Sequence, residues 1–298
     1  MRRKYISAGL VLLGGCTWGC MGLLVRPLNA YRLNSIDICF VRAVVTMLAM
    51  GLWLLAFNKT ALKIKLKDLW CFLGTGALSV AFFNYCYFRT ITLTSLSVAA
   101  VLLYTAPAFV MIMSAILFKE KLGKKKLVAL ILAFIGCCLV SGIIGGEAKL
   151  TVGGFLVGIG AGFGYALYSI FSRYAINRGY SSMTITFYTF LTCTITTACL
   201  ADVNRVSKVM VSDFSLLIKT ILLVLLVTLI PYLAYTKGLD GLENGTASVI
   251  ASVEPVMATL LGVVVYHEVP DLWMAVGILL VLGSIVLVNL NLNYKNKK

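Results

Sequence analysis

Long apolar runs separated by short polar segments occupy the chain from end to end. Each run has roughly the 20 residues that a helix needs to cross the hydrocarbon core of a bilayer. Seven runs hold no charged residue: 5–25, 69–88, 90–118, 127–146, 150–172, 179–201 and 272–294. Three more contain one or two charges: 36–58, 214–236 and 244–266. The pattern predicts an all-α integral membrane protein with ten transmembrane helices.

Composition agrees with this prediction. Hydrophobic residues make up 60% of the chain and charged residues 12%, whereas a soluble domain is about half apolar. Ten spans in 298 residues leave little chain for loops, so we expect the functional residues to lie inside the helical bundle. Neither a cluster of Asp, Glu and His nor a nucleophile motif occurs at a predicted membrane face, so we do not expect an enzyme.

The net charge of +15 is distributed unevenly along the chain. If the N-terminus is cytoplasmic, 18 of the 26 Lys and Arg residues fall in inner segments and six in outer ones. The positive-inside rule then predicts that both termini are cytoplasmic, in a multi-pass protein of a bacterial inner membrane. Because this basic excess follows topology, we expect contact with lipid headgroups and no nucleic-acid partner.

Neither the cysteines nor the N-terminal segment changes this interpretation. The nine cysteines show no metal-type spacing and His267 is the only histidine, so we expect no metal and no cofactor. The start, MRRKYISAGLVLLGGC, resembles a lipoprotein signal ending at Cys16. The chain continues with the apolar TWGCMGLLV instead of a polar tether, which favours an uncleaved first helix.

The sequence also aligns with itself at an offset of 148 residues. This offset pairs Pro107 with Pro255 and Glu120 with Glu268. The repeat predicts two five-helix units, residues 1–146 and residues 150–294. Because five is odd, the second unit enters the membrane in the opposite sense. Inverted repeats of this kind are typical of secondary transporters, which bind substrate near the midplane between the repeats.

Glu254 and Pro255 interrupt the apolar run 244–266 near its middle. An ionised acid at that depth is costly unless it faces a cavity or a partner. The proline lacks an N–H and leaves the carbonyl of Ala251 without its helical donor. Together they predict a kink that lines a cavity, with Glu254 as a substrate-binding residue. The alternative is a glutamate that only holds a neighbouring helix.

Pro107 predicts the corresponding kink in the run 90–118, beside Tyr104. This half carries Ala106 where the other carries Glu254. One acid on one side of a pseudo-symmetric site suits recognition of an amine or coupling to a proton. A static bend remains the alternative for Pro107.

Aromatic and polar residues at helical spacing supply candidate walls for the cavity. The candidates are Trp18, Asn84, Tyr165, Tyr168 and Tyr232. Their rings can stack on an apolar or cationic cargo, and their polar atoms can orient it. Packing or an interfacial belt remains an equal alternative for each. Tyr87 and Tyr235 lie near helix ends, where the belt is the stronger interpretation.

For Arg42 and for a set of glycines, a structural role is the first interpretation. Arg42 lies about two turns inside the run 36–58, where a side chain extended toward the outer headgroups is expected. Alternatively, Arg42 binds a substrate carboxylate opposite Glu254. The run 150–172 contains GxxxG spacings, which indicate close helix packing.

Two related segments of the chain resemble those of a known family. YFRTITLTSLSVAAVLLYTAPAFVMIMSAILFKEKL and YTKGLDGLENGTASVIASVEPVMATLLGVVVYHEVP resemble the two signature segments of the drug/metabolite transporter superfamily, EamA-type branch. The resemblance covers essentially the whole chain. It implies ten helices in a basket around a central cavity, alternating access, and export of small metabolites such as amino acids.

The leading hypothesis is therefore a secondary active exporter of a small polar metabolite, an amino acid or a relative of one, with a coupling proton. A nucleotide-sugar-like exchanger is the second hypothesis, although Arg42 and Lys219 are the only basic residues within the predicted spans. A receptor or scaffold that does not transport is the third. The sequence leaves the oligomeric state open.

Overall fold

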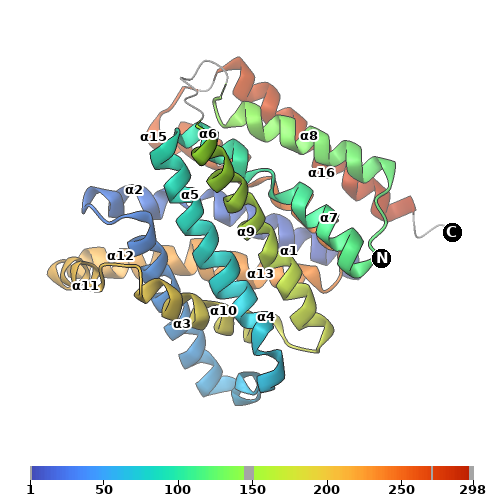
Figure 1. Cartoon of the computed structure of the whole chain (residues 1–298). Coiled ribbons are helices and arrows are strands. Elements are labelled where there is room, and N and C mark those ends of the chain that lie inside the picture. Colours follow the sequence, from blue (N-terminus) through green and yellow to red (C-terminus); the bar gives the residue numbers. More distant parts are fainter. Residues whose placement is uncertain (1, 144–150, 270, 295–298) are drawn as a thin grey trace.

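The computed structural model describes residues 2–143, 151–269 and 271–294. Every regular element in these residues is helical (Figure 1). The first half contains α1 (Arg2–Gly19), α2 (Gly22–Ala30), α3 (Ser35–Phe57), η1 (Lys59–Leu62), η2 (Leu66–Asp68), α4 (Leu69–Leu73), η3 (Gly74–Ala81), α5 (Phe82–Leu93), α6 (Leu96–Leu103), α7 (Ala106–Phe118) and α8 (Lys124–Val140). The second contains α9 (Val152–Asn177), α10 (Ser182–Ala198), α11 (Val203–Ser212), α12 (Phe214–Val224), η4 (Leu225–Leu229), α13 (Ile230–Leu239), α14 (Asn244–Ala251), α15 (Glu254–Tyr266) and α16 (Leu272–Tyr294).

Eight helical segments in these residues are long and apolar enough to cross a membrane, so the protein is a multi-pass membrane protein. A ninth results if α10 and α11, which are bent by 110° at their junction, form one span. α8 corresponds to the tenth predicted span, the apolar run 127–146. Its 17 residues extend over about 26 Å, slightly less than a hydrocarbon core of roughly 30 Å. The prediction of ten spans is therefore met in part, and the predicted unit boundary between 146 and 150 lies outside the described residues.

The start of α3 explains a charge that lies in an apolar run. Asn34 caps α3, because its side-chain oxygen accepts the N–H groups of Ile36 and Asp37 at 2.8 and 2.9 Å. The Asp37 carboxylate accepts the Asn34 N–H in return, which completes a capping box. Its other oxygen accepts the N–H of Asp202 at 2.9 Å. Asp37 therefore completes the cap at the start of α3 and ties this end of the helix to the start of α11.

Pro107 and Pro255 lie just after short breaks in two spans, Leu96–Phe118 and Asn244–Tyr266, at the positions where the sequence predicts kinks. α6 ends at Leu103 and α7 begins at Ala106, while α14 ends at Ala251 and α15 begins at Glu254. Pro107 and Pro255 each stand in the first turn of the second segment. That position suits proline, because the first N–H groups of a helix have no intrahelical acceptor. The two broken helices have equal segment lengths, eight and 13 residues.

Each break packs against a glycine from the first helix of the other half. A Cβ added at Gly15 of α1 would lie 2.9 Å from the Ala251 carbonyl oxygen. A Cβ added at Gly162 of α9 would lie 2.8 Å from the Leu102 carbonyl oxygen. Gly154 and Gly158 of α9 are also closely packed, as the GxxxG spacings predicted. Only a residue without a Cβ allows helices to approach this closely.

The remaining helices surround this crossing. α9 packs against α5, α6 and α7, and α1 packs against α13, α14 and α15. α8 and α16 lie side by side at one edge of the bundle (Figure 1). The spans Leu66–Leu93 and Phe214–Leu239 each contain a π-helical stretch, η3 and η4 respectively. π-helical turns are frequent at functional sites, and these two present Ser79 and Thr228 to the interior.

Candidate functional site

The candidate site lies where the two broken helices meet α1, α9 and α13. Two small cavities open there, of about 20 and 10 Å³. The larger is lined by Leu103, Tyr104, Ala106, Pro107, Val110, Tyr165, Ser169, Tyr235, Ser248, Ala251, Ser252 and Glu254. The smaller is lined by Trp18, Ser79, Phe83, Tyr165, Tyr168, Ser169, Tyr232 and Tyr235. Because Tyr165, Ser169 and Tyr235 line both, we treat the two cavities as one central site.

Glu254 is the acid of this site. It is the first residue of α15 and is partly buried, with one carboxylate oxygen 3.2 Å from the Tyr165 hydroxyl, which donates to it. Tyr165 comes from α9. The hydrogen bond therefore joins α15, which follows one break, to α9, which packs against the break between α6 and α7. A carboxylate in this position can accept a proton or pair with an ammonium group.

Aromatic rings form the wall beside this acid. Trp18 contacts Tyr165, Tyr232 and Tyr235, with ring centroids 6.2, 5.2 and 5.3 Å apart. Tyr168 and Tyr232 meet edge to face at 4.9 Å. These distances are in the range of favourable aromatic contacts. Electron-rich ring faces next to a carboxylate suit a cationic or amine-bearing cargo.

Serine and threonine hydroxyls pair with two tyrosines of the wall, Tyr168 and Tyr235. The hydroxyl of Tyr168 lies 2.6 Å from Thr236 Oγ1, and that of Tyr235 lies 2.7 Å from Ser169 Oγ. Buried hydroxyls of this kind are costly without a partner. The pairs hold α9 against α13 and leave the Tyr165 hydroxyl as the one directed at Glu254.

The cavities are closed in this structure. A volume of about 20 Å³ holds a water molecule, whereas sites for small ligands measure roughly 300 Å³ or more. A metabolite therefore enters only if the surrounding helices separate. The predicted residues Trp18, Tyr104, Tyr165, Tyr168, Tyr232, Glu254 and Pro107 all line this closed site.

Arg42, Asn84 and Pro255 do not line it. Arg42 is 8% exposed and its Nε donates to Thr228 Oγ1 at 3.0 Å. The expected extension toward the headgroups is therefore wrong, because a hydroxyl from the π-helical stretch holds the guanidinium inside the bundle. Asn84 donates to the Val80 carbonyl of its own turn at 2.7 Å. Pro255 is buried next to Glu254.

Tyr235, for which the sequence favoured the interfacial belt over the cavity wall, belongs to the site, and so does Ser169, which was not predicted. Tyr235 is 3% exposed, so its assignment to an interfacial belt is wrong. α13 continues to Leu239 and carries Tyr235 one turn deeper than the end of the apolar run suggested. The spacing of Tyr232 and Tyr235, three residues apart on one helix face, was the available signal.

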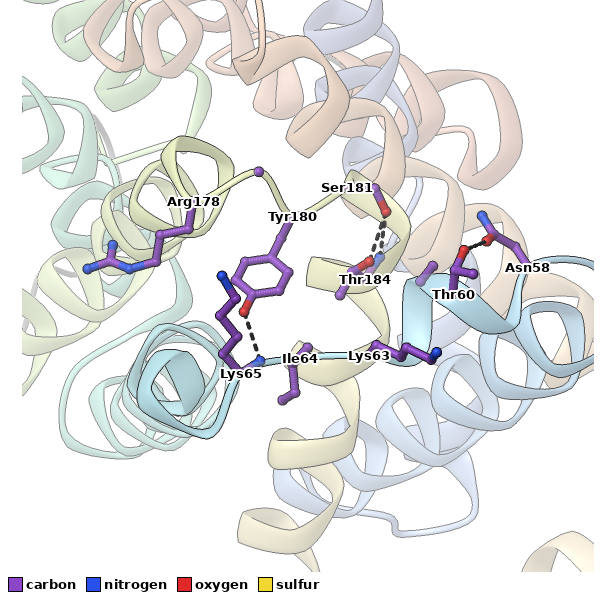
Figure 2. Close-up of a pocket in the computed structure, with 11 residues that line it drawn as sticks. Asn58, Thr60, Lys63, Ile64, Lys65, Arg178, Tyr180, Ser181 and Thr184 are labelled. Carbon is purple, nitrogen blue, oxygen red and sulfur yellow. Dashed lines mark hydrogen bonds between the residues drawn. The ribbon is translucent and has the colours of Figure 1, made fainter.

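A larger pocket of about 440 Å³ lies away from the central site, between the α3–α4 connection and the turn from α9 to α10. Figure 2 shows the Tyr180 ring reaching from that turn toward Lys65, whose backbone N–H donates to the Tyr180 hydroxyl at 3.0 Å. The same hydroxyl donates to the buried Asp68 at 2.8 Å. Asp68 also pairs with Arg178. These bonds fasten the α3–α4 connection to the turn between α9 and α10.

Metal ligation has no support among the residues that the structure describes. They contain no group of three or more His, Cys, Asp or Glu side chains that could hold an ion.

Comparison with known proteins gives the family. The sequence profile of the EamA-like transporter family matches residues 6–142 and 152–290. The uncharacterized transporter YxxF of Bacillus subtilis (strain 168) is 26% identical over 296 residues, covering 96% of this chain and 90% of that protein. An uncharacterized transporter of Archaeoglobus fulgidus is 28% identical over 220 residues, covering 70% of this chain and 74% of that protein.

A solved structure described only as the crystal structure of a protein superposes with a TM-score of 0.80. It covers 95% of this chain and 96% of that one at 17% identity, which shows that the fold is shared. The family match spans nearly the whole sequence on both sides of residues 143–151. The chain therefore belongs to the EamA-like transporter family.

Proposed function

We propose that this protein is a secondary active transporter that exports a small polar metabolite by alternating access. The observation that carries the proposal is the pair of broken helices that meet at Glu254, Tyr165 and the aromatic wall. Helix breaks inside a membrane leave backbone groups that are tolerated where they line a cavity. Discontinuous helices at the interface of two repeats are a common way to build a transport site.

The chemistry of the site favours a cargo with an amine. Among the residues that the structure describes, Glu254 is the only acid lining the central cavities, and the aromatic wall lies beside it. An amino acid or a related compound fits this combination, with its ammonium group at Glu254 and its side chain against the rings. A coupling proton would occupy the same carboxylate when the cargo leaves. The cargo undergoes no chemical change in this proposal.

The arrangement also bears on the two competing functions. Arg42 is engaged with Thr228 and does not line the cavities, so a phosphorylated cargo would lack a fixed cation at the site. A scaffold would have no need for a partly buried acid at a helix break. For orientation, we propose a bacterial inner membrane with both termini in the cytoplasm, on the basis of the charge distribution.

Reconstitution in liposomes tests the proposal. Liposomes that contain the purified protein are loaded with an unlabelled amino acid, polyamine or nucleotide sugar. Counterflow is then measured as uptake of the same compound in labelled form. Saturable counterflow of an amine-bearing class, which Tyr165→Phe weakens and Tyr85→Phe does not, is the expected result. Tyr85 is the matched control because its side chain is 48% exposed. Counterflow of nucleotide sugars alone would favour the exchanger, and no counterflow with any panel would favour the scaffold.

A further inference from the structure

The two ends of the bundle hold the broken helices differently, and this difference bears on how the proposed transport cycle works. One end carries the linker 119–126 with its five lysines, and we call it the lysine-rich end. There α14 packs against α7. At the opposite end, the corresponding elements α6 and α15 make no comparable contact, although both are described in full. The broken helices therefore pack together at the lysine-rich end in a way that the opposite end does not match.

A carboxylate from the linker binds the start of α14. Glu120 accepts the N–H of Asn244 at 2.7 Å and the N–H of Gly245 at 3.2 Å. A carboxylate at a helix N-terminus satisfies unpaired N–H groups and complements the helix dipole. Lys126 of α8 lies 3.9 Å from the same carboxylate and also pairs with Glu243. The Glu120 and Lys126 side chains are only 9% and 5% exposed.

Asn244 extends this contact to two further helices. Its Nδ2 donates to Ser114 Oγ of α7 at 3.1 Å, and its Oδ1 accepts from Arg173 Nε of α9 at 2.9 Å. Arg173 also donates to the Leu242 carbonyl. Ser114, Glu120, Lys126, Arg173 and Asn244 thus join α7, α8, α9 and α14 in one buried polar network, which we call the Glu120 latch.

The internal repeat identifies the counterpart of Glu120 at the opposite end. Glu120 follows Lys119, and Glu268 follows His267, and both preceding residues have a left-handed backbone with φ of 55° and 56°. The N–H of Glu120 donates to the Ser114 carbonyl, and that of Glu268 donates to the Gly262 carbonyl. The two glutamates therefore leave their helices in the same way.

Their side chains have different partners. Glu268 pairs with Arg26 of α2 at 2.7 Å, and both side chains are about half exposed, at 53% and 50%. Three latch positions lose their polar groups at the offset of 148 residues: Asn244 corresponds to Leu96, Ser114 to Gly262 and Lys126 to Met274. Gly15 and Gly162, which pack on the two breaks, relate α1 to α9 at an offset of 147 residues, so Arg173 corresponds to Arg26. The opposite end therefore retains the carboxylate and the arginine.

We propose that the Glu120 latch is the gate that holds the lysine-rich end closed. During transport this latch opens, and Glu268 binds the start of α6 at the opposite end instead. In that exchange Glu268 leaves Arg26 and accepts the N–H groups of Leu96 and Ser97, the counterparts of Asn244 and Gly245. This gate deepens the proposed transport function and rests on it for its role in a cycle.

The unequal chemistry of the two ends determines the resting conformation. Closure at the lysine-rich end makes charge-assisted bonds to Glu120 and an amide network around Asn244, whereas the opposite end has the carboxylate and the arginine but no counterpart of Asn244, Ser114 or Lys126. Charge-assisted bonds are stronger than neutral ones. The free protein therefore rests with the lysine-rich end closed, and cargo binding must supply the difference that opens it.

Distance measurements on the reconstituted full chain, lacking its native cysteines, test the gate. One pair of spin labels at Lys121 and Lys237 reports on the lysine-rich end, and a second pair at Thr92 and Val269 reports on the opposite end. All four positions are exposed. Glu120→Gln is expected to raise the population of the long distance at the lysine-rich end at least about tenfold and to shorten the distance at the opposite end.

Two further variants keep the test decisive. Lys124→Gln removes a charge from the same linker outside the latch, and the resting distances are expected to stay as in the parent. Leu96→Asn with Gly262→Ser builds latch groups into the opposite end and leaves the lysine-rich end intact. This pair is expected to shift the distances in the same direction as Glu120→Gln, which a merely structural role for Glu120 would not produce.

The outcomes separate the gate from the transport proposal. If Glu120→Gln and the double variant both shift the distances while no labelled cargo shows counterflow, the latch stands and transport of the proposed cargo fails. If counterflow occurs and the distances of both variants match the parent, the latch is overturned. If Glu120→Gln does not fold, the double variant alone decides by the same criterion.

Discussion

At the scale of single residues, Glu254 carries the central hypothesis because it joins the aromatic wall to a helix break. Glu254→Gln keeps the size of the side chain and can still accept a hydrogen bond from Tyr165, but it removes both charge and titration. We expect normal folding, loss of the pH dependence of transport, and a fall in affinity for an amine-bearing cargo of about tenfold or more.

Counterflow measured across a pH series checks this expectation. If Glu254→Gln keeps the parent pH profile and rate while Glu254→Leu only lowers the yield of folded protein, the acid is structural. The coupling site would then lie elsewhere in the bundle.

Tyr180 gives a prediction outside the membrane-spanning segments. Its hydroxyl donates to Asp68 and accepts from the Lys65 N–H, and burial raises the pKa of Tyr180 above its ordinary value. Tyr180→Phe should cost about 1–3 kcal/mol of stability. A raised folded pKa means that the tyrosine's contribution is fully present below its unfolded pKa of about 10 and is lost as pH rises through the folded value.

Thermal unfolding in detergent measures this difference. The gap between parent and Tyr180→Phe should be constant from about pH 7 to 9 and should narrow above about pH 10. Tyr85→Phe serves as the exposed control. An equal loss of stability in both variants would contradict the assignment of these bonds.

At the scale of elements, the helix breaks depend on glycines as much as on prolines. A Cβ at Gly15 would lie 2.7 Å from Val253 Cγ1 and 2.9 Å from the Ala251 carbonyl oxygen, whereas a Cβ at Gly9 of the same helix meets nothing within 4 Å. Gly15→Ala should therefore cost about 1–3 kcal/mol through overpacking, lower the unfolding temperature and reduce transport.

Gly9→Ala is the matched control, and we expect no loss of stability because the added methyl group has space and alanine favours helix. Unfolding temperature and counterflow are measured for both variants. If Gly15→Ala behaves like Gly9→Ala, the first helix does not support the break between α14 and α15.

At the scale of the whole molecule, the orientation in the membrane follows from charge. Lys125 stands in the lysine-rich linker and is exposed, so it should be cytoplasmic. Lys125→Cys, in a background without native cysteines, should resist a membrane-impermeant thiol reagent added to intact cells and react after the cells are opened. Labelling from outside in intact cells would reverse the proposed topology and with it the side on which the Glu120 latch lies.

Two segments of the sequence resembled the family that the profile match then showed. The sequence by itself also determined the membrane class, and it predicted an acid and a proline break in the run 244–266. These depend on the lengths of apolar runs, on charge and on local backbone chemistry, which act over neighbouring residues. The tertiary structure decided which side chains meet. It placed Tyr235 in the central site, bound Arg42 to Thr228, and packed the two proline breaks on Gly15 and Gly162. It also closed the bundle at one end through contacts between Glu120 and Asn244. These outcomes depend on packing between helices 60 or more residues apart in the chain. A local pattern does not specify which helices meet or at what depth.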